Sequence, residues 1–431
     1  MLGYLGFPEF RRDKVAGFTD PTTGQDRARS LYNGNSFSPW HSNDPFSPLA
    51  ADPPHERDDI SLQLGPRANG RNAMDGFVTN YAKVATVQKN DRTPVMSYFG
   101  MNELPITHFF AEQFAICDHW FSSLPAGTQP NRLIAMSGQT LIDKNTHILP
   151  RQHLVYDWLD EHNISWRVYH EGMPFFAMMP HWTPRILDNA NFRGFAELQP
   201  DILKARPEED ELPSVIFLEP EYTDAPHTGR SSDDHAPSGA SAGQEFLMKA
   251  YNAATLDPDL WSGSVMIVTY DEHGGFFDHV SPVELTTPPP DGATYPPFTT
   301  SGVRVPAFIV SPFVEPTQIY NKTLDHTSIL KFLGQRFDPK GSYSAPVDQR
   351  PVQSVLDVLN FELSERNIPA APNLNPYLAQ MQGPVGRTPG TVPYNDIARS
   401  FQTALDLLHA YSVPATQSKF SDLESFVTRT T

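Results

Sequence analysis

The fold is decided by one stretch of the chain, Val265-Met266-Ile267-Val268-Thr269-Tyr270-Asp271-Glu272-His273-Gly274-Gly275-Phe276-Phe277-Asp278-His279-Val280. Four apolar residues lead into a turn rich in Asp, Glu, His and Gly, a pattern that predicts a buried strand ending in a site. In open α/β sheets, ligands bind just beyond the carboxyl ends of the strands. The alternative is a polar loop that caps a strand and leaves its acidic residues solvated.

The same stretch contains groups that bind metal ions. Asp271 and Glu272 supply carboxylate oxygens, and His273 and His279 add imidazoles. Oxygen ligands suit Mg, Ca or Mn, and they suit Zn when imidazole joins them. The pair Gly274-Gly275 lets the backbone come close to a ligand. The stretch therefore predicts a site for a divalent metal ion.

Length, charge and cysteine content limit the function. The chain has 431 residues and a formal net charge of -18, which argues against a surface that binds nucleic acid. Cys117 is the only cysteine, so no disulfide forms within the chain, and we expect a buried, inert thiol. No run of about 18 apolar residues occurs, so no transmembrane helix is predicted. No signal peptide is visible at Met1.

Short apolar strands alternate with amphipathic helices, which indicates an α/β fold with a doubly wound, mainly parallel sheet flanked by helices. Strands are expected at 166–169, 214–218, 265–269 and 305–310, and helices at 131–139, 241–256 and 327–337. A helical pattern is also expected from about residue 104, with Phe109, Phe110, Phe114 and Ile116 at helix-like spacing.

The domain organisation follows from where these elements lie. We expect residues 1–345 to form a catalytic domain with long loop insertions, of which residues 1–90 are the first. Residues 346–431 are expected to form a C-terminal extension or cap, with an amphipathic terminal helix over 397–408. The apolar, aromatic segment 173–182 is either a lip that contacts lipid or an ordinary part of the core.

A second candidate group is Gly127-Thr128-Gln129-Pro130-Asn131-Arg132. A hydroxyl and free backbone N–H groups at the start of a helix form a natural anion site. Thr128 is therefore a candidate phosphoryl-accepting nucleophile, provided that a metal or a base lowers the pKa of its hydroxyl. The alternative is that Thr128 only caps the helix.

Three further histidines stand beside acidic residues. Asp234-His235 could supply metal ligands or an acid–base pair, or could simply form the loop that enters a helix. His55 is a weak signal by itself, and Asp325-His326 is interpreted as the N-cap of the helix that follows. The motifs of nucleophile-elbow serine hydrolases, zincin proteases and nucleotide-binding enzymes are not found in the sequence.

Four motifs together resemble one family: residues 127–132, 233–235, 269–280 and Gly-Val-Arg-Val-Pro at 302–306. They resemble the bacterial and plant non-specific phospholipases C and the related bacterial acid phosphatases, from the first residues to about residue 340. The resemblance implies the fold of the alkaline phosphatase superfamily and a hydrolase that acts on phosphoric ester bonds. It also implies a divalent metal cofactor (Zn, Ca, Mn or Mg) and a phospholipid or a small phosphoester as substrate.

The resemblance assigns roles to individual residues. Thr128 matches the nucleophile, which also touches the metal, and Asp271 and Glu272 match metal ligands. The residues matched around the phosphoryl group are His55 and His235, with Asp234 beside His235. Four further residues are expected to bind substrate: Asn131, Arg132, His273 and His279.

The chain departs from the family at its start. Family members open with a strand followed by Glu-Asn-Arg-Ser-Phe-Asp-His and then Met-Leu-Gly-Tyr or similar, whereas this chain begins at Met1-Leu2-Gly3-Tyr4. We therefore expect a start codon assigned too late, or a fragment, without the first strand and without the Glu-Asn pair that completes the metal site. A secreted or periplasmic location follows from the resemblance alone.

The leading prediction is metal-dependent, phospholipase C-type hydrolysis of phospholipid phosphodiesters, because the nucleophile position carries Thr rather than Ser. One alternative is an acid phosphatase acting on phosphomonoesters. Another is a catalytically impaired fragment or pseudoenzyme. A peripheral contact with a membrane is compatible with a lipid substrate, whereas a sulfatase is disfavoured because no Cys-x-Pro-x-Arg stretch exists.

Overall fold

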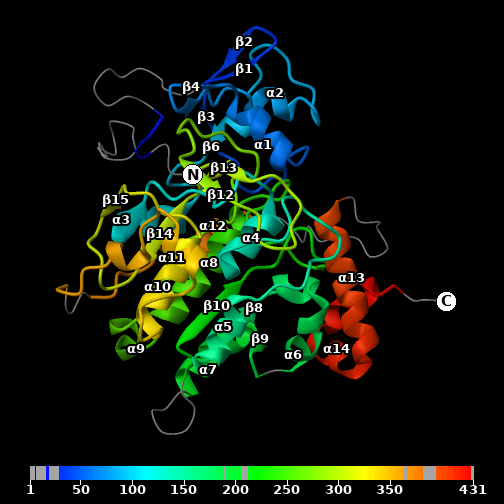
Figure 1. Ribbon diagram of the computed structural model, residues 1–431, viewed down its shortest axis with the longest axis vertical. Coiled ribbons are helices and arrows are strands. Elements are labelled where there is room, and N and C mark those ends of the chain that lie inside the picture. Colours follow the sequence, from blue (N-terminus) through cyan, green and yellow to red (C-terminus); the bar gives the residue numbers. More distant parts are fainter. Residues whose placement is uncertain are drawn as a thin grey trace. The chain divides into compact units, whose positions relative to one another are not determined.

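The computed structural model describes Leu5 and residues 16–18, 29–188, 190–204, 212–363, 367–381 and 395–428. The chain divides into two compact units (Figure 1). The first unit comprises Met1–Lys144 and Ser262–Pro372, and the second comprises Asn145–Trp261 and Asn373–Thr431. Each unit combines helices with β-sheet, so the predicted α/β class is confirmed. The predicted boundary near residue 345 stays a prediction.

The first unit holds most of the strands. Its strands are β1 (Ser30–Tyr32), β2 (Asn35–Phe37), β3 (Trp40–His41), β4 (Arg67–Ala68), β5 (Arg71–Asn72), β6 (Ser97–Tyr98), β7 (Ala115–Cys117), β11 (Met266–Thr269), β12 (Glu284–Thr287), β13 (Phe298–Thr300), β14 (Ala307–Val310) and β15 (Ile319–Tyr320). Its helices are α1 (Arg57–Leu64), α2 (Phe77–Tyr81), α3 (Pro105–Gln113), α4 (Thr128–Ser137), α10 (Thr327–Phe337) and α11 (Ala345–Gln349), with 3-10 turns at Pro94–Met96 and Val355–Val358.

The second unit is mainly helical around a small sheet. Its strands are β8 (Trp166–His170), β9 (Phe192–Gly194) and β10 (Val215–Glu219). Its helices are α5 (Val155–Glu161), α6 (Thr183–Leu187), α7 (Leu198–Lys204), α8 (Ser241–Ala254), α12 (Asn375–Leu378), α13 (Asp396–Tyr411) and α14 (Val413–Lys419), with 3-10 turns at Phe175–Met178, Pro180–Trp182, Phe195–Glu197 and Ser421–Phe426. Helix α9 (Pro258–Ser262) includes the point along the chain where the second unit ends, at Trp261, and the first unit resumes, at Ser262.

The largest sheet of the first unit has the strand order β11-β14-β7-β15. Strand β14 runs antiparallel to both β11 and β7, whereas β15 runs parallel to β7. The expectation of mainly parallel pairing is therefore wrong for this sheet. The apolar runs predicted the positions of both strands, although β14 is buried throughout and β11 is only partly buried. An apolar run carries no information on strand direction.

The chain segment around Phe114 differs from the sequence prediction in a second way. The helix expected from residue 104 ends at Gln113, and Ala115–Cys117 form β7. All three residues of β7 are buried, and they pair with β14 and β15. Because a short, fully apolar run fits either a helix or a buried strand, the available ladder partners decide its structure. Cys117 is 1% exposed, which confirms the prediction of a buried thiol.

The sheet of the second unit has the order β10-β8-β9 and is parallel throughout, as predicted. Helix α13 packs against the segment Phe175–Met178, where the rings of Phe175 and Phe401 meet edge to face at 6.1 Å. Met173, Phe176 and Met179 are each at most 1% exposed. This segment therefore belongs to the core, and the alternative of a lipid-contacting lip is wrong for these side chains.

Helix α13 confirms the amphipathic helix predicted over 397–408, and α14 follows it directly (red in Figure 1). Helices α8 and α10 likewise confirm the helices predicted over 241–256 and 327–337. In the part of the chain that the structure describes, no helix has the length and apolar character needed to cross a membrane.

Candidate functional site

One edge of the four-stranded sheet collects the polar residues of the first unit. Strands β11, β7 and β15 point in one direction and β14 points in the other. The carboxyl ends of the three strands therefore lead, at the same edge, into Asp271-Glu272, Asp118-His119 and Asp325-His326. Arg304 precedes β14 and lies at this edge too, as its bridge with Phe121 shows. Three acidic segments and Arg304 therefore lie at the same edge of this sheet.

The main chain of Asp271 is held by a histidine. Nε2 of His326 donates to the Asp271 carbonyl oxygen at 2.7 Å, and the indole N–H of Trp120 donates to Nδ1 of His326 at 3.2 Å. Because Nδ1 accepts a hydrogen bond, the ring proton lies on Nε2 and the ring is neutral. Burial lowers the pKa of His326, which agrees with this tautomer. His326 therefore positions Asp271 without adding charge.

Glu272 lies between two loops. Its Oε2 accepts the N–H of Gly274 at 2.6 Å, and its Oε1 is 3.8 Å from Nε2 of His55. Nδ1 of His55 donates to the Pro53 carbonyl at 2.7 Å, which turns Nε2 toward the carboxylate. Gly275 has φ +73°, and a Cβ there would lie 2.7 Å from Cβ of Pro53. Only glycine allows this approach of the two loops, whereas the predicted approach of the Gly-Gly backbone to a ligand stays a prediction.

His273 is buried behind the same loop. Its Nε2 lies 2.7 Å from Oε1 of Gln63, whose amide nitrogen donates to the Pro54 carbonyl at 2.7 Å. Burial, together with the charge of His55, lowers the pKa of His273 to about 3. His273 is therefore neutral at ordinary pH, and its predicted contact with substrate stays a prediction.

Thr128 begins helix α4, and the residue that caps the helix is Gly127. No side-chain hydrogen bond caps this end, and Oγ1 of Thr128 is buried with no hydrogen-bond partner among the described residues. The alternative that Thr128 only caps the helix therefore does not describe this side chain. Its hydroxyl lies at a helix N-terminus, where the helix dipole favours negative charge.

Asn131 fixes the loop in front of Thr128. Its Oδ1 accepts the N–H of Leu124 at 2.9 Å, and its Nδ2 donates to the carbonyls of Leu124, Ala126 and Gly127 at 3.1, 2.8 and 3.2 Å. The amide is 0% exposed. We therefore assign it a positioning role, and its predicted contact with substrate stays a prediction.

Hydrogen bonds join the loop before α4 to the Asp325-His326 segment. The N–H of His326 donates to Oγ of Ser123 at 3.2 Å, in the loop that leads to α4. Arg350 donates to the Ser123 carbonyl at 2.8 Å and to Asp325 at 2.6 Å. The charge of Arg132, one turn after Thr128, contributes to the lowered pKa of His326. The loop before α4 is therefore joined to the Asp325-His326 segment, whose His326 in turn contacts the main chain of Asp271.

A buried arginine holds the end of the Asp271 loop. Nε and Nη2 of Arg304 donate to the two carboxylate oxygens of Asp278 at 2.8 Å each, and Nη1 donates to Asp118 Oδ1 at 3.2 Å. Burial alone would raise the pKa of Asp278, but the Arg304 guanidinium outweighs it and holds that pKa well below its usual range. Phe277, next to Asp278, donates its N–H to the Val95 carbonyl at 2.9 Å.

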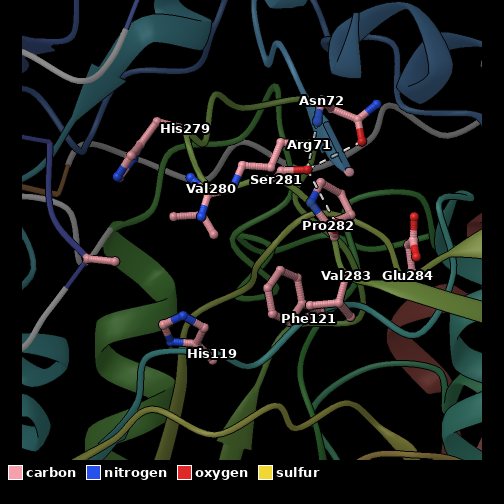
Figure 2. Close-up of a pocket in the computed structure, with 12 residues that line it drawn as sticks. Arg71, Asn72, His119, Phe121, His279, Val280, Ser281, Pro282, Val283 and Glu284 are labelled. Atoms are coloured by element: carbon pink, nitrogen blue, oxygen red, sulfur yellow. Dashed lines mark hydrogen bonds between the residues drawn. The ribbon is translucent and has the colours of Figure 1, made fainter. Parts of the chain in front are cut away.

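His279 lines a cavity of about 810 Å³ together with Arg71, His119 and Phe121 (Figure 2). Its side chain is 7% exposed, and neither ring nitrogen has a hydrogen-bond partner among the described residues. Nδ1 lies 3.4 Å from Asp278 Oδ1. The predicted substrate-binding role of His279 stays a prediction, and this cavity is where such a contact would form.

The donor set fits a divalent cation. Oδ2 of Asp271 and Oγ1 of Thr128 are buried acceptors with no hydrogen-bond partner in the part of the chain that the structure describes. Leaving such acceptors buried and unpaired is costly unless something binds them. Carboxylate and hydroxyl oxygens suit Mg, Ca or Mn, and a neighbouring imidazole such as that of His55 also admits Zn.

Asp233, Asp234 and His235 lie in the second unit, in the loop before α8. Asp233 accepts the N–H and the hydroxyl of Thr223 at 2.7 and 2.8 Å, and burial raises its pKa to about 6. Asp234 has φ +56° and lies against Gly243, where a Cβ would be 2.1 Å from Asp234 Oδ1. The turn is therefore tightly fixed. The roles predicted for Asp234 and His235 stay predictions.

Sequence reasoning assigned no positioning role to three residues that hold these loops, namely His326, Arg304 and Arg350. The sequence favours Asp325-His326 as a helix N-cap, and Asp325 does accept the N–H of Thr327 at 2.9 Å. The contact of His326 with Asp271 was not foreseen. A usable signal existed for Arg304, because it is an arginine within the otherwise apolar run Gly-Val-Arg-Val-Pro.

Comparison with known proteins places these motifs in context. The model of the phosphoesterase family matches residues 9–339. A non-specific phospholipase C3 of Arabidopsis thaliana is 32% identical over 291 residues, which cover 62% of this chain and 53% of the relative. Phospholipase C B of Mycobacterium tuberculosis is 28% identical over 392 residues, which cover 80% of this chain and 70% of the relative. The chain spans about half the length of the plant relative that it matches.

Similarity to solved structures is weaker. A protein in the alkaline phosphatase superfamily from Vibrio parahaemolyticus aligns with a TM-score of 0.33 and 13% identity, covering 73% of this chain and 82% of that chain. The α/β class rests on the helices and sheets described above.

Proposed function

The chain belongs to the phosphoesterase family, and we propose that it is a phosphoester hydrolase of the phospholipase C type with Thr128 as its nucleophile. The observation that carries this proposal is the buried Thr128 hydroxyl at the N-terminus of α4, which has no hydrogen-bond partner among the described residues. The names of the two relatives, both phospholipases C, support a phosphodiester of a phospholipid as substrate.

In the proposed reaction, Oγ1 of Thr128 attacks phosphorus in line with the leaving alcohol. A new phosphorus–oxygen bond forms to Thr128, and the bond to the alcohol breaks. Water then hydrolyses the phosphothreonine and regenerates the hydroxyl. The backbone N–H groups at the start of α4 and the guanidinium of Arg132 stabilise the negative charge on the phosphoryl oxygens.

Asp271, Glu272 and Thr128 are the residues that would hold a divalent metal ion. When bound, such an ion supplies positive charge that lowers the pKa of the Thr128 hydroxyl and neutralises the phosphoryl group. His326 contributes by fixing the main chain of Asp271, and Gly274 contributes by donating its N–H to Glu272.

The leaving alcohol needs a proton, and His55 is the residue of the first unit best placed to provide one. Its Nδ1 is engaged by the Pro53 carbonyl, which leaves Nε2 to exchange a proton next to Glu272. The role predicted from sequence for His235, with Asp234 beside it, remains part of the proposal.

The proposal is tested with Thr128→Ala and Thr128→Ser in the full chain. Rates are measured on p-nitrophenyl phosphorylcholine, a diester, and on p-nitrophenyl phosphate, a monoester, with Zn, Mn, Mg or Ca added. We expect Thr128→Ala to abolish turnover and Thr128→Ser to retain part of it, because serine keeps a nucleophilic oxygen. Thr79→Ala, in α2 of the same unit, is the matched control and should leave turnover unchanged.

Each outcome decides a different point. Near-normal turnover by Thr128→Ala would remove Thr128 from the mechanism. Cleavage of the monoester alone would move the assignment to an acid phosphatase. Silence of the unsubstituted chain on both substrates with every metal would support the impaired fragment or pseudoenzyme. A phosphothreonine at residue 128, trapped by acid quench and found by mass spectrometry, would support the two-step reaction directly.

A further inference from the structure

A buried relay of three groups ends at the main chain of Asp271. The indole N–H of Trp120 donates to Nδ1 of His326 at 3.2 Å, and Nε2 of His326 donates to the Asp271 carbonyl at 2.7 Å. Trp120 is 0% exposed and His326 is 1% exposed. Because both side chains are buried, their polar groups depend on protein partners rather than on bulk water.

The two ends of the relay decide where the imidazole proton lies. An indole N–H can only donate a hydrogen bond, and a carbonyl oxygen can only accept one. The tautomer of His326 with its proton on Nε2 satisfies both. The other neutral tautomer would direct its N–H at the indole N–H of Trp120 and its lone pair at the Asp271 carbonyl, so both contacts would become repulsive. Trp120 therefore favours the one tautomer that can hold Asp271.

Backbone contacts fix the positions of both rings. Trp120 follows β7 and forms a parallel bridge with Leu324, which continues the pairing of β7 with β15. The Trp120 carbonyl accepts the N–H of Val305 at 3.0 Å, and the N–H of His326 donates to Oγ of Ser123 at 3.2 Å. The relay is thus built on strand ends, which hold side chains more precisely than free loops do.

The relay holds Asp271 by its main chain and not by its carboxylate. Oδ2 of Asp271 is buried with no hydrogen-bond partner among the described residues, so fixing the carbonyl orients the residue without occupying this oxygen. The alternative is that His326 only fills the core between β7 and β15. That role would need the shape of the ring but not a defined position of its proton, and this difference can be measured.

We propose that Trp120 is a positioning residue for the candidate metal ligand Asp271 and that it acts through the tautomer of His326. The inference rests on the metal-binding role proposed for Asp271, but the tautomer itself can be measured without metal or substrate. Partners that orient a metal ligand in this way typically contribute about 10- to 100-fold to metal affinity or activity.

NMR of the full chain, with isotope-labelled histidine and no added metal, tests the tautomer. The chemical shifts of the two ring nitrogens distinguish a protonated nitrogen from one with a lone pair, and the His326 signals are assigned by their absence in His326→Gln. In the unsubstituted chain we expect the proton on Nε2. Trp120→Phe keeps an aromatic ring without an N–H, so a measurable fraction of molecules should carry a proton on Nδ1, because no donor then opposes it.

Trp40→Phe is the matched control for this substitution. It lies in the same unit and also removes an indole hydrogen bond, the one that Trp40 donates to the Thr93 carbonyl at 2.9 Å. It should leave both the tautomer of His326 and the affinity for metal unchanged.

Calorimetric titration with Mn and with Zn measures the consequence for metal binding. We expect Trp120→Phe to weaken binding about 10-fold and His326→Ala about 100-fold. His326→Gln should retain most of the affinity, since its planar amide offers an acceptor to Trp120 and a donor to Asp271. Because Trp120 acts through His326, Trp120→Phe should cause almost no further loss in the His326→Ala background.

A proton on Nδ1 in the unsubstituted chain, or none on Nδ1 in folded Trp120→Phe, would overturn the proposal. Additive losses in the double variant would do so too, and so would a His326→Gln variant as impaired as His326→Ala. Circular dichroism checks folding, and if Trp120→Phe does not fold, the unsubstituted chain and His326→Gln still decide. A chain that binds neither metal but shows the expected change of tautomer would refute the metal role of Asp271 and support the relay.

Discussion

Arg304→Met tests how the candidate site of the first unit is held. The guanidinium makes two hydrogen bonds of 2.8 Å to Asp278 and one of 3.2 Å to Asp118. Removing one partner of a buried ion pair costs about 3–5 kcal/mol, because the remaining charge stays buried without compensation. In a unit of roughly 250 residues, that loss lowers Tm by roughly 6–20 °C.

Thermal unfolding followed by circular dichroism measures this shift. Arg67→Met is the matched control, because Arg67 pairs at 2.9 Å with Glu284, whose side chain is 75% exposed. An exposed pair of this kind contributes about 1 kcal/mol or less, so the control should unfold almost as the unsubstituted chain does. Arg304→Lys keeps the positive charge but loses the bidentate contact with Asp278. Its Tm should therefore lie between the Tm of Arg304→Met and that of the unsubstituted chain.

The Tm difference between Arg304→Met and the unsubstituted chain should depend on pH. In the unsubstituted chain the pKa of Asp278 lies below its usual range, so this group stabilises the fold above about pH 4 and loses that contribution as pH falls. Without Arg304, burial raises the pKa of Asp278 instead, and the folded state then binds more protons than the unfolded state. The Tm difference between Arg304→Met and the unsubstituted chain should therefore be smaller at pH 5 than at pH 8.

A second substitution separates this explanation from simple loss of packing. Adding Asp278→Asn to Arg304→Met removes the uncompensated charge, so the double variant should recover at least about 1 kcal/mol. A Tm shift under 2 °C for Arg304→Met, a shift that does not depend on pH, or a double variant less stable than Arg304→Met would refute the reasoning.

Three further predictions address other positions. Gly275→Ala combines φ +73° with a Cβ 2.7 Å from Pro53, so it should lower stability by about 2–4 kcal/mol in chemical unfolding, whereas Gly292→Ala, at φ +90° in open space, should cost only about 1 kcal/mol. Asn131→Ala should lower kcat on p-nitrophenyl phosphorylcholine about tenfold or more, with KM nearly unchanged, because it frees the loop that positions Thr128. Glu221 has a raised pKa of about 8, so its contribution to stability falls as pH rises from about 4.5 to 8, and Glu221→Gln should gain Tm relative to the unsubstituted chain over that range.

The fold could be predicted from sequence where burial leaves a pattern. The apolar runs at 214–218, 265–269 and 305–310 marked β10, β11 and β14, although among these three strands only β14 is buried throughout. Strand direction could not be predicted in the same way. The antiparallel course of β14 depends on which strands lie beside it, and Ala115–Cys117 became a strand because β14 and β15 were available as partners.

The candidate site, too, could be predicted from the sequence only in part. Asp271, Glu272 and Thr128 stand in local motifs whose residue types indicate a chemistry, so they could be proposed as site residues from the sequence. His326 and Arg304 act through contacts with Trp120 and Asp118, which are 206 and 186 residues away along the chain. No local pattern encodes contacts of that range, so these positioning residues emerged only from the structure.

Three carboxylates described in the first unit differ in the groups that bind them. Asp278 and Asp325 each meet an arginine, at 2.8 and 2.6 Å, and these buried ion pairs hold the loop ends in place. Asp271 belongs to the same edge of the sheet, yet its main chain is held by a neutral histidine and its Oδ2 has no hydrogen-bond partner among the described residues. A buried carboxylate is stable only when positive charge or hydrogen bonds compensate it. Asp278 and Asp325 are thus compensated by arginines, whereas Oδ2 of Asp271 has no hydrogen-bond partner among the described residues, and this difference supports the proposal that a cation binds at Asp271.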